Sequence, residues 1–117
     1  MNQKKQNETA IQIQVIQWCR QYPWGQFLYH IPNESIGGMG WTVRNRQIGM
    51  RKGVPDLCLP IPMKGYHGLY IELKTEKGRA SNEQKRWIEA LNTFGYKACI
   101  CKGFDETIKV LKEYTDG

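Results

Sequence analysis

The sequence has no long hydrophobic run, and the positive charge of its first seven residues is not followed by an apolar stretch. Neither a membrane-spanning helix nor a secretory signal is therefore expected. None of the four cysteines is spaced as C-x-x-C, and all four lie in apolar stretches, which argues against a zinc site. Buried thiols of this kind suit a reducing compartment, so we expect a cytoplasmic protein with no membrane partner.

Nucleotide-binding loops and repeats are also missing. The glycine-rich segment 32–40 contains neither G-x-G-x-x-G nor G-K-[ST], the patterns that cradle the phosphates of a bound nucleotide. We expect this segment to form a loop near the substrate instead. No internal repeat, low-complexity tract or linker interrupts the 117 residues. The length therefore predicts a single domain over residues 1–117, with residues 1–7 as a flexible tail.

The chain is basic, with 17 lysines and arginines against 11 aspartates and glutamates and a formal net charge of +6. Such a balance favours a polyanionic partner. Because no segment suits a membrane, nucleic acid is the expected partner.

Helical and strand periodicities alternate along the chain, which predicts an α/β fold with a small mixed sheet flanked by helices. The expected helices are residues 8–22, a short helix between 41 and 50 that ends at Gly49 or Gly53, a helix opened by a capping box of Ser81 and Gln84, and a last helix capped by Asp105. The expected strands are residues 26–31, a strand beginning at Asp56, residues 68–74, and a central strand at 96–102 with helices on both faces.

Two neighbouring strands carry the residues that point most directly to chemistry. Side chains alternate faces along a strand, so Glu72 and Lys74 share one face of the segment Gly68–Lys74. Asp56, at the start of the preceding strand, can add a second carboxylate, and paired carboxylates suit a hard cation such as Mg²⁺. A lysine beside that cation can orient a water or neutralise charge on a phosphate. The alternative is an exposed ion pair of little consequence.

Two further polar residues are placed to join this site. Extending the buried stripe of the first helix backwards from Ile11 leads to Glu8, which can help hold a metal directly or through water. A glutamate there is also favoured by the helix dipole alone. Gln84 lies one turn before Trp87 and so faces the sheet, where its amide can orient water or a phosphate. Capping of the helix is an equally good reason for Gln84, and the two roles are compatible.

Basic residues lead directly into the Asp56 segment. The cluster consists of Arg44, Arg46, Arg51 and Lys52, and Lys85 and Arg86 follow on the later helix. One interpretation is a solvated basic surface. Beside a metal site, however, such cations would steer and hold phosphates, because phosphate contacts dominate nucleic-acid affinity.

The ordered set of Glu8, Gly53-x-Pro55-Asp56, Glu72-x-Lys74 and Ser81-x-x-Gln84 resembles the PD-(D/E)XK nuclease superfamily, and specifically a stand-alone VRR-NUC domain of the phage and bacterial type. The resemblance covers nearly the whole chain, from Glu8 to the last helix, and Asn33-Glu34 also matches a common feature of the group. It implies a restriction-endonuclease-like α/β core and metal-dependent hydrolysis of phosphodiesters.

By position, the resemblance implies that Asp56, Glu72 and the backbone carbonyl of Leu73 ligate Mg²⁺, for which Mn²⁺ would substitute. Glu8 would complete the acidic set, Lys74 would position or activate the attacking water, and Gln84 would support the site. The resemblance also implies a branched DNA substrate. Relatives in which the domain is part of a larger repair nuclease are associated with flaps, and stand-alone homodimers are associated with four-way (Holliday) junctions. We therefore expect a homodimeric endonuclease for branched DNA. The alternatives are a nucleic-acid-binding module that does not cut, and a flap or restriction-type nuclease with a different substrate.

Overall fold

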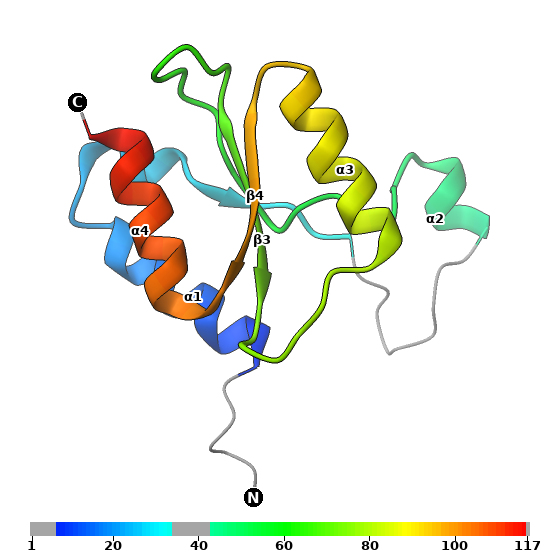
Figure 1. The fold of residues 1–117 in the computed structure, drawn as a ribbon. Helices are drawn as coiled ribbons and strands as arrows, with labels where there is room; N and C mark the ends of the chain where they lie inside the picture. The colour runs from blue at the N-terminus through cyan, green and yellow to red at the C-terminus, as the bar shows by residue number, and fades with distance from the viewer. Residues whose placement is uncertain (1–6, 34–42, 117) are drawn as a thin grey trace, which may run out of the picture.

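The computed structural model describes residues 7–33 and 43–116, and it confirms the expected α/β class with a small mixed sheet (Figure 1). The sheet has the strand order β1-β2-β3-β4. Its strands are β1 (Tyr29–His30), β2 (Leu57–Leu59), β3 (Leu69–Lys74) and β4 (Lys97–Lys102). Strands β1, β2 and β3 pair antiparallel, and β3 pairs parallel with β4. The expected flexible tail, most of the glycine-rich loop and the start of the short helix lie outside the described residues.

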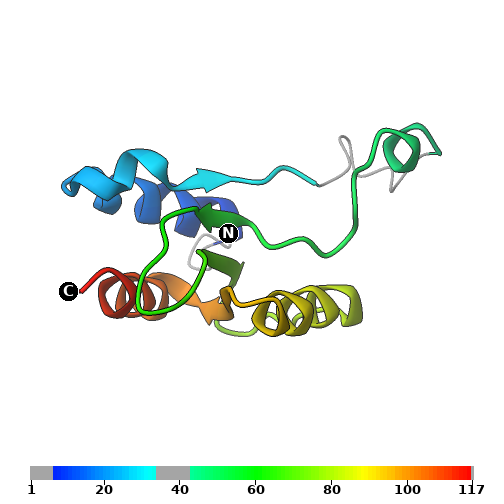
Figure 2. The ribbon, with the colours of Figure 1, turned by 90° about the horizontal axis from the view of Figure 1, so that it is seen from above.

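Helices cover the sheet from two sides. Helices α1 (Glu8–Cys19) and α4 (Gly103–Thr115) pack together against β3, and α3 (Asn82–Thr93) packs against β4 from the other side (Figure 2). Because α3 connects the two parallel strands, it forms the crossover that a parallel pair requires. The short helix α2 (Val43–Gln47) stands away from the sheet, beyond the α3 side.

Alternation along β3 separates the core from the polar face of the sheet. Leu69, Ile71 and Leu73 are completely buried in a cluster with Ile11 and Val15 of α1 and with residues of α4. The intervening Tyr70, Glu72 and Lys74 therefore turn to the opposite face. This is the arrangement that the strand period predicts, and it places Glu72 on the side covered by α3.

The first predicted strand is shorter than expected, and the first helix ends earlier. Residues Pro23–Phe27 form a 3₁₀ helix, η2, so only Tyr29–His30 pair in the sheet. Helix α1 ends at Cys19 rather than at Tyr22, because the chain tightens there into three-residue hydrogen bonds. A side chain on Gly25 would lie 1.9 Å from the carbonyl oxygen of Cys19. The glycine thus allows η2 to fold back onto the end of α1.

Two other expectations were wrong in detail. Strand β4 has helices on both faces, but it is the edge strand of the described sheet, because it pairs with β3 alone among the described strands. Helix α4 is not capped by Asp105. It begins at Gly103, and the Glu106 carboxylate accepts a 2.7 Å hydrogen bond from the backbone N–H of Lys102. Both acidic residues lie in the first turn, where the helix dipole favours negative charge.

The four cysteines are free thiols, and three of them are buried. Burial raises the pKa of Cys19 to about 12, so this thiol is a small apolar core group and a poor nucleophile. Among the helices in the described part of the chain, none has the length and apolar character to cross a bilayer.

Candidate active site

The two acidic strand residues meet through the register of the antiparallel pair. Leu57 lies opposite Ile71, so continuing the register by one residue places Asp56 opposite Glu72. Residues directly opposite each other share a face of the sheet and interact. The Asp56 Oδ2 atom also accepts a 2.7 Å hydrogen bond from the backbone N–H of Leu73, which fixes the half-buried aspartate against β3. The predicted pairing of these two carboxylates is therefore built into the sheet.

Glu72 is the most unusual residue of the site, because its side chain is only 2% exposed. One carboxylate oxygen, Oε2, contacts Lys74 and Gln84. The other oxygen, Oε1, is buried and has no hydrogen-bond partner among the described residues. Burial and the negative charge of Asp56 raise the pKa of Glu72 to about 8, although the Lys74 ammonium opposes this shift. An exposed surface ion pair is thereby excluded for the Glu72–Lys74 pair.

Lys74 links the sheet to the first helix. Its Nζ atom lies 3.5 Å from Glu72 Oε2 and 3.8 Å from Glu8 Oε2, and the lysine is nearly as buried as Glu72. Glu8 is in the first turn of α1, where Asn7 caps the helix by accepting a hydrogen bond from the N–H of Ala10. The predicted convergence of Glu8 on the site thus occurs, and its described contact there is with Lys74.

Gln84 has both roles that its position in the sequence allows. Its amide oxygen accepts a 2.8 Å hydrogen bond from the N–H of Ser81, and the Ser81 hydroxyl accepts one from the N–H of Gln84, which completes the predicted capping box. Its amide nitrogen donates a 2.9 Å hydrogen bond to Glu72 Oε2. Because the oxygen is held by the cap, the donor end of the amide is directed at the carboxylate.

The acidic residues fit a hard divalent cation. Asp56 and Glu72 supply oxygen ligands from adjacent strands, the carbonyl of Leu73 lies between Glu72 and Lys74 in the chain, and the buried Oε1 of Glu72 needs a partner. No group of three or more His, Cys, Asp or Glu side chains within residues 7–33 and 43–116 is gathered at ligand spacing. A cation here would therefore need the carbonyl, water or substrate oxygens besides the two carboxylates.

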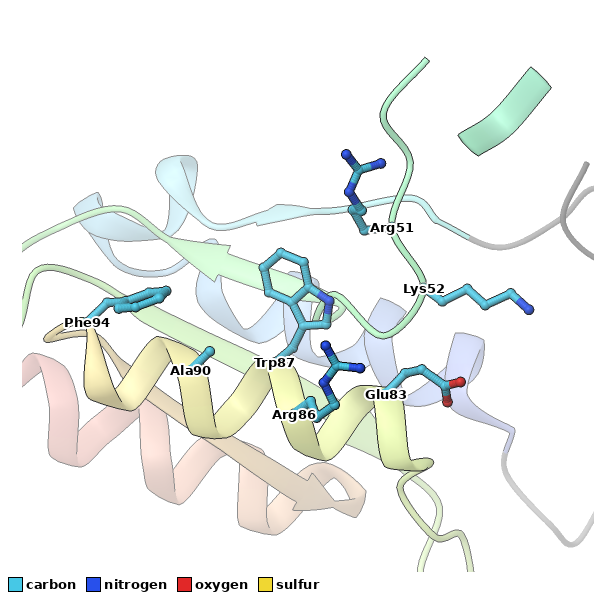
Figure 3. A pocket seen from close by; sticks show the side chains of 7 residues that line it. All are labelled: Arg51, Lys52, Glu83, Arg86, Trp87, Ala90 and Phe94. Carbon is cyan, nitrogen blue, oxygen red and sulfur yellow. The ribbon is translucent and has the colours of Figure 1, made fainter. Parts of the chain in front are cut away.

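The predicted basic residues divide into two groups. Arg51 and Lys52 line a groove of about 400 Å³ with Arg86, Trp87 and other residues of α3 (Figure 3). Arg44 and Arg46 are exposed on α2, and Lys85 is exposed on α3, and none of these three side chains lines that groove.

Some residues at the site were not recognised from the sequence. Trp87 reads as part of the apolar stripe of its helix, yet it is half-buried and forms a wall of the groove. Asn33 matches a common feature of the resembled family, but the sequence did not indicate what this residue does. Its amide donates hydrogen bonds to the carbonyls of Arg51 and Val54, and so fastens the segment that leads to Asp56. A signal for Trp87 existed, since it lies one helical turn after Gln84.

A mixed sheet that carries a buried Glu-x-Lys pair beside an aspartate is a nuclease-type α/β arrangement. The chain belongs to the VRR-NUC domain family, because the family model matches residues 3–105, which confirms the resemblance. A solved structure described as a VRR-NUC domain protein superposes with a TM-score of 0.83 at 30% sequence identity, and the match covers 94% of this chain and 88% of that one. Among proteins with curated functions, none matched this chain.

Proposed function

We propose that this domain is a divalent-metal-dependent endonuclease that hydrolyses phosphodiesters in DNA. The observation that carries the proposal is the buried Glu72 carboxylate, which has one oxygen without a described partner and lies beside Asp56, Lys74 and Gln84. Burying a carboxylate with one oxygen unpaired costs free energy, and strongly shifted pKa values are concentrated at functional sites. Membership of a nuclease family supports the same conclusion.

Asp56, Glu72 and the carbonyl of Leu73 would hold Mg²⁺ or Mn²⁺, with Glu8 helping directly or through water. A cation bound there polarises the phosphate and lowers the pKa of a coordinated water. Oxygen donors of this kind are the ligands that Mg²⁺ and Mn²⁺ prefer.

The remaining residues position charge. Lys74 is held by Glu72 and Glu8, so its ammonium is fixed where it can orient the attacking water or neutralise charge that develops on the phosphate. Gln84 keeps one oxygen of Glu72 in place through a hydrogen bond that the helix cap orients. Preorganised polar groups of this type lower the barrier because they need not rearrange during the reaction.

Selectivity is proposed to follow the shape of the DNA, with branched molecules such as four-way junctions as substrates. The exposed cations Arg44, Arg46, Arg51, Lys52 and Lys85 would contact phosphates, which carry no base sequence. Two sites at a fixed separation would cut a junction symmetrically, so a homodimer is part of this proposal. Sedimentation that shows only monomers with and without junction DNA would contradict the dimer.

The function is tested with a panel of labelled four-way junction, flap, single-stranded and plain duplex DNA, each incubated with Mg²⁺, Mn²⁺ or EDTA. Cleavage is expected only with a metal, with junctions cut faster than duplex. Asp56→Ala and Lys74→Ala should abolish cleavage, and Lys109→Ala, on the exposed side of α4, serves as the control that should retain it. Salt-sensitive binding without cleavage of any substrate would instead indicate a binding module that does not cut.

A further inference from the structure

The groove beside α3 combines aromatic rings with positive charge. Trp87 projects from the helix into the groove, Phe94 lies at one end, and Arg51 and Arg86 flank the tryptophan (Figure 3). Phe94 is 64% exposed, so its ring is accessible to a ligand in the groove. The volume of about 400 Å³ falls within the range of roughly 300–1,000 Å³ that is typical of small-ligand sites.

The wall opposite α3 is held in place by a glycine. Gly53 has a φ of +91°, and a Cβ atom at this position would lie 2.6 Å from the backbone of Glu83. The chain therefore crosses the first turn of α3 in direct backbone contact, immediately after Arg51 and Lys52. Asn33 fastens the same segment through the carbonyls of Arg51 and Val54.

The groove and the candidate active site share two segments of the chain, although no side chain of the site lines the groove. The two walls of the groove are the segment that continues to Asp56 and the helix that supplies Gln84 to Glu72. Trp87 follows Gln84 by three residues, so the two side chains lie on neighbouring turns of one helix face. A nucleic acid strand with a phosphate at Glu72 would therefore pass its next nucleotides along the groove.

We propose that this groove binds unpaired nucleotides of the DNA, with bases stacked on Trp87 and Phe94 and their backbone phosphates near Arg51, Lys52 and Arg86. Aromatic side chains in a positively charged groove are the features that bind single-stranded nucleic acid. A paired base is already stacked between its neighbours and cannot offer its face to Trp87. The groove would thus favour branched substrates with unpaired bases beside the scissile phosphate, such as flaps, forks or a junction opened at its centre, which narrows the proposed function and rests on it.

The single carboxylate of the groove refines this picture. Glu83 lies at the end nearest the active site, next to Lys52 (Figure 3). Its carboxylate points away from the two arginines, and the aromatic end by Phe94 has no acidic residue among its lining side chains (Figure 3). Phosphates are therefore expected to follow the Arg51 and Arg86 side of the groove.

Binding in EDTA tests the proposal without cleavage. Fluorescence anisotropy would compare a fork with a five-nucleotide unpaired arm, the same fork with abasic residues in that arm, and a fully paired duplex. Trp87→Ala and Phe94→Ala should weaken binding to the intact fork roughly five- to 150-fold and leave duplex binding unchanged. The abasic fork should bind wild-type protein as weakly as the intact fork binds Trp87→Ala.

Controls separate stacking from folding and from catalysis. Phe27→Ala removes a phenyl ring that is 53% exposed on η2, outside the groove, and should change nothing. Trp87→Phe keeps an aromatic face and should restore most of the affinity for the intact fork. Phe94 is exposed, so Phe94→Ala should leave folding intact. Equal binding of intact and abasic forks, or wild-type affinity in both alanine variants, would overturn the proposal. If the wild-type protein cleaved no DNA with Mg²⁺ or Mn²⁺ but still bound the intact fork more tightly than the abasic fork, the proposed function would be contradicted and the groove proposal would stand.

Discussion

Gln84 donates a hydrogen bond to the buried carboxylate of Glu72 with the same amide group that completes a helix cap. The start of α3 and the candidate active site are thereby coupled through one side chain. The amide oxygen belongs to the cap, and the amide nitrogen belongs to the site. A single isosteric substitution can separate these two contributions.

Gln84→Glu is expected to keep the helix and lose activity. A glutamate at this position also completes a capping box, so the helix should be retained, while loss of the donor to buried Glu72 should lower the free energy of unfolding by about 1–3 kcal/mol. The substitution places a second carboxylate against Glu72 where a donor stood, and cleavage should fall roughly 10- to 100-fold. Single-turnover cleavage and urea denaturation, measured on the same preparations, check both statements.

Ser81→Ala is the matched control for the cap. It removes the hydroxyl that accepts from the N–H of Gln84, which should lower stability by about 1 kcal/mol. The backbone N–H of Ser81 still binds the Gln84 side chain, so cleavage by the folded protein should stay within a few-fold of wild type. If Ser81→Ala lost as much activity as Gln84→Glu, the coupling would be through the helix rather than through Glu72.

Lys74→Met is expected to abolish cleavage while DNA binding persists. The lysine is buried between Glu72 and Glu8 and so has no free ammonium for the DNA surface, but it is fixed beside the proposed position of the phosphate. Removal of a positioned proton-transfer group costs about 10²- to 10⁴-fold in rate. Anisotropy with junction DNA in EDTA should show affinity within a few-fold of wild type. Cleavage within five-fold of wild type would remove Lys74 from the mechanism.

The central residues of the site could be predicted because strands impose a period of two. Once β3 is recognised, Glu72 and Lys74 must share the face opposite Leu73, and antiparallel pairing of β2 with β3 brings Asp56 beside Glu72. The capping box of Ser81 and Gln84 is equally local, since its hydrogen bonds span only three residues. Features that depend on local geometry were therefore accessible from the sequence.

Features that depend on contacts between distant segments of the chain could not be predicted from the sequence. The groove exists because Gly53 touches the backbone of Glu83, a contact between segments 30 positions apart that no periodicity encodes. Trp87 has the helical phase of a residue that faces the sheet, but it is only half-buried and lines the groove. The same limit applies to η2, where the close approach of Gly25 to Cys19 replaces the expected start of β1.

Metal-free wild-type protein is expected to lose stability between about pH 4.5 and pH 8 relative to Glu72→Gln. Burial raises the pKa of Glu72 from 4.5 to about 8, so the folded state binds this proton more tightly than the unfolded state. As the pH rises through that window, Glu72 ionises in the unfolded chain but stays protonated in the folded protein, so folding becomes less favourable. Outside the window, at lower or higher pH, the difference between the two proteins should be constant.

Thermal denaturation in EDTA across this pH range measures the effect. Subtracting the melting temperature of wild type from that of Glu72→Gln at each pH removes the contribution of the other titrating groups, which both proteins share. At pH 8 the melting temperature of Glu72→Gln should exceed that of wild type, although the variant should not cleave DNA. A difference that does not vary with pH would show that Glu72 titrates normally in the folded protein.

The salt dependence of DNA binding should identify the phosphate contacts. Each phosphate-binding cation that is removed reduces the slope of log affinity against log salt by about 1. Arg51→Ala and Arg86→Ala, in the groove, should each show this reduction, and Arg44→Ala on α2 tests whether that helix also contacts the DNA. Lys109→Ala is the control, because Lys109 lies on α4 on the other side of the sheet (Figure 2). An unchanged slope in both groove variants would exclude phosphate binding there.

Gly53→Ala should damage both stability and the groove, because two independent effects act at this residue. The positive φ costs an alanine about 1–2 kcal/mol, and the clash of its Cβ with the backbone of Glu83 adds about 1–3 kcal/mol. Gly49→Ala is a matched control with a φ of +97° and no atom within 4 Å of the added Cβ, so it should carry the first cost alone. Urea denaturation should therefore rank wild type above Gly49→Ala and Gly49→Ala above Gly53→Ala, and only the last should weaken binding to unpaired DNA. Equal destabilisation by the two substitutions would mean that the segment moves away from α3 without cost, and that Gly53 does not hold the groove together.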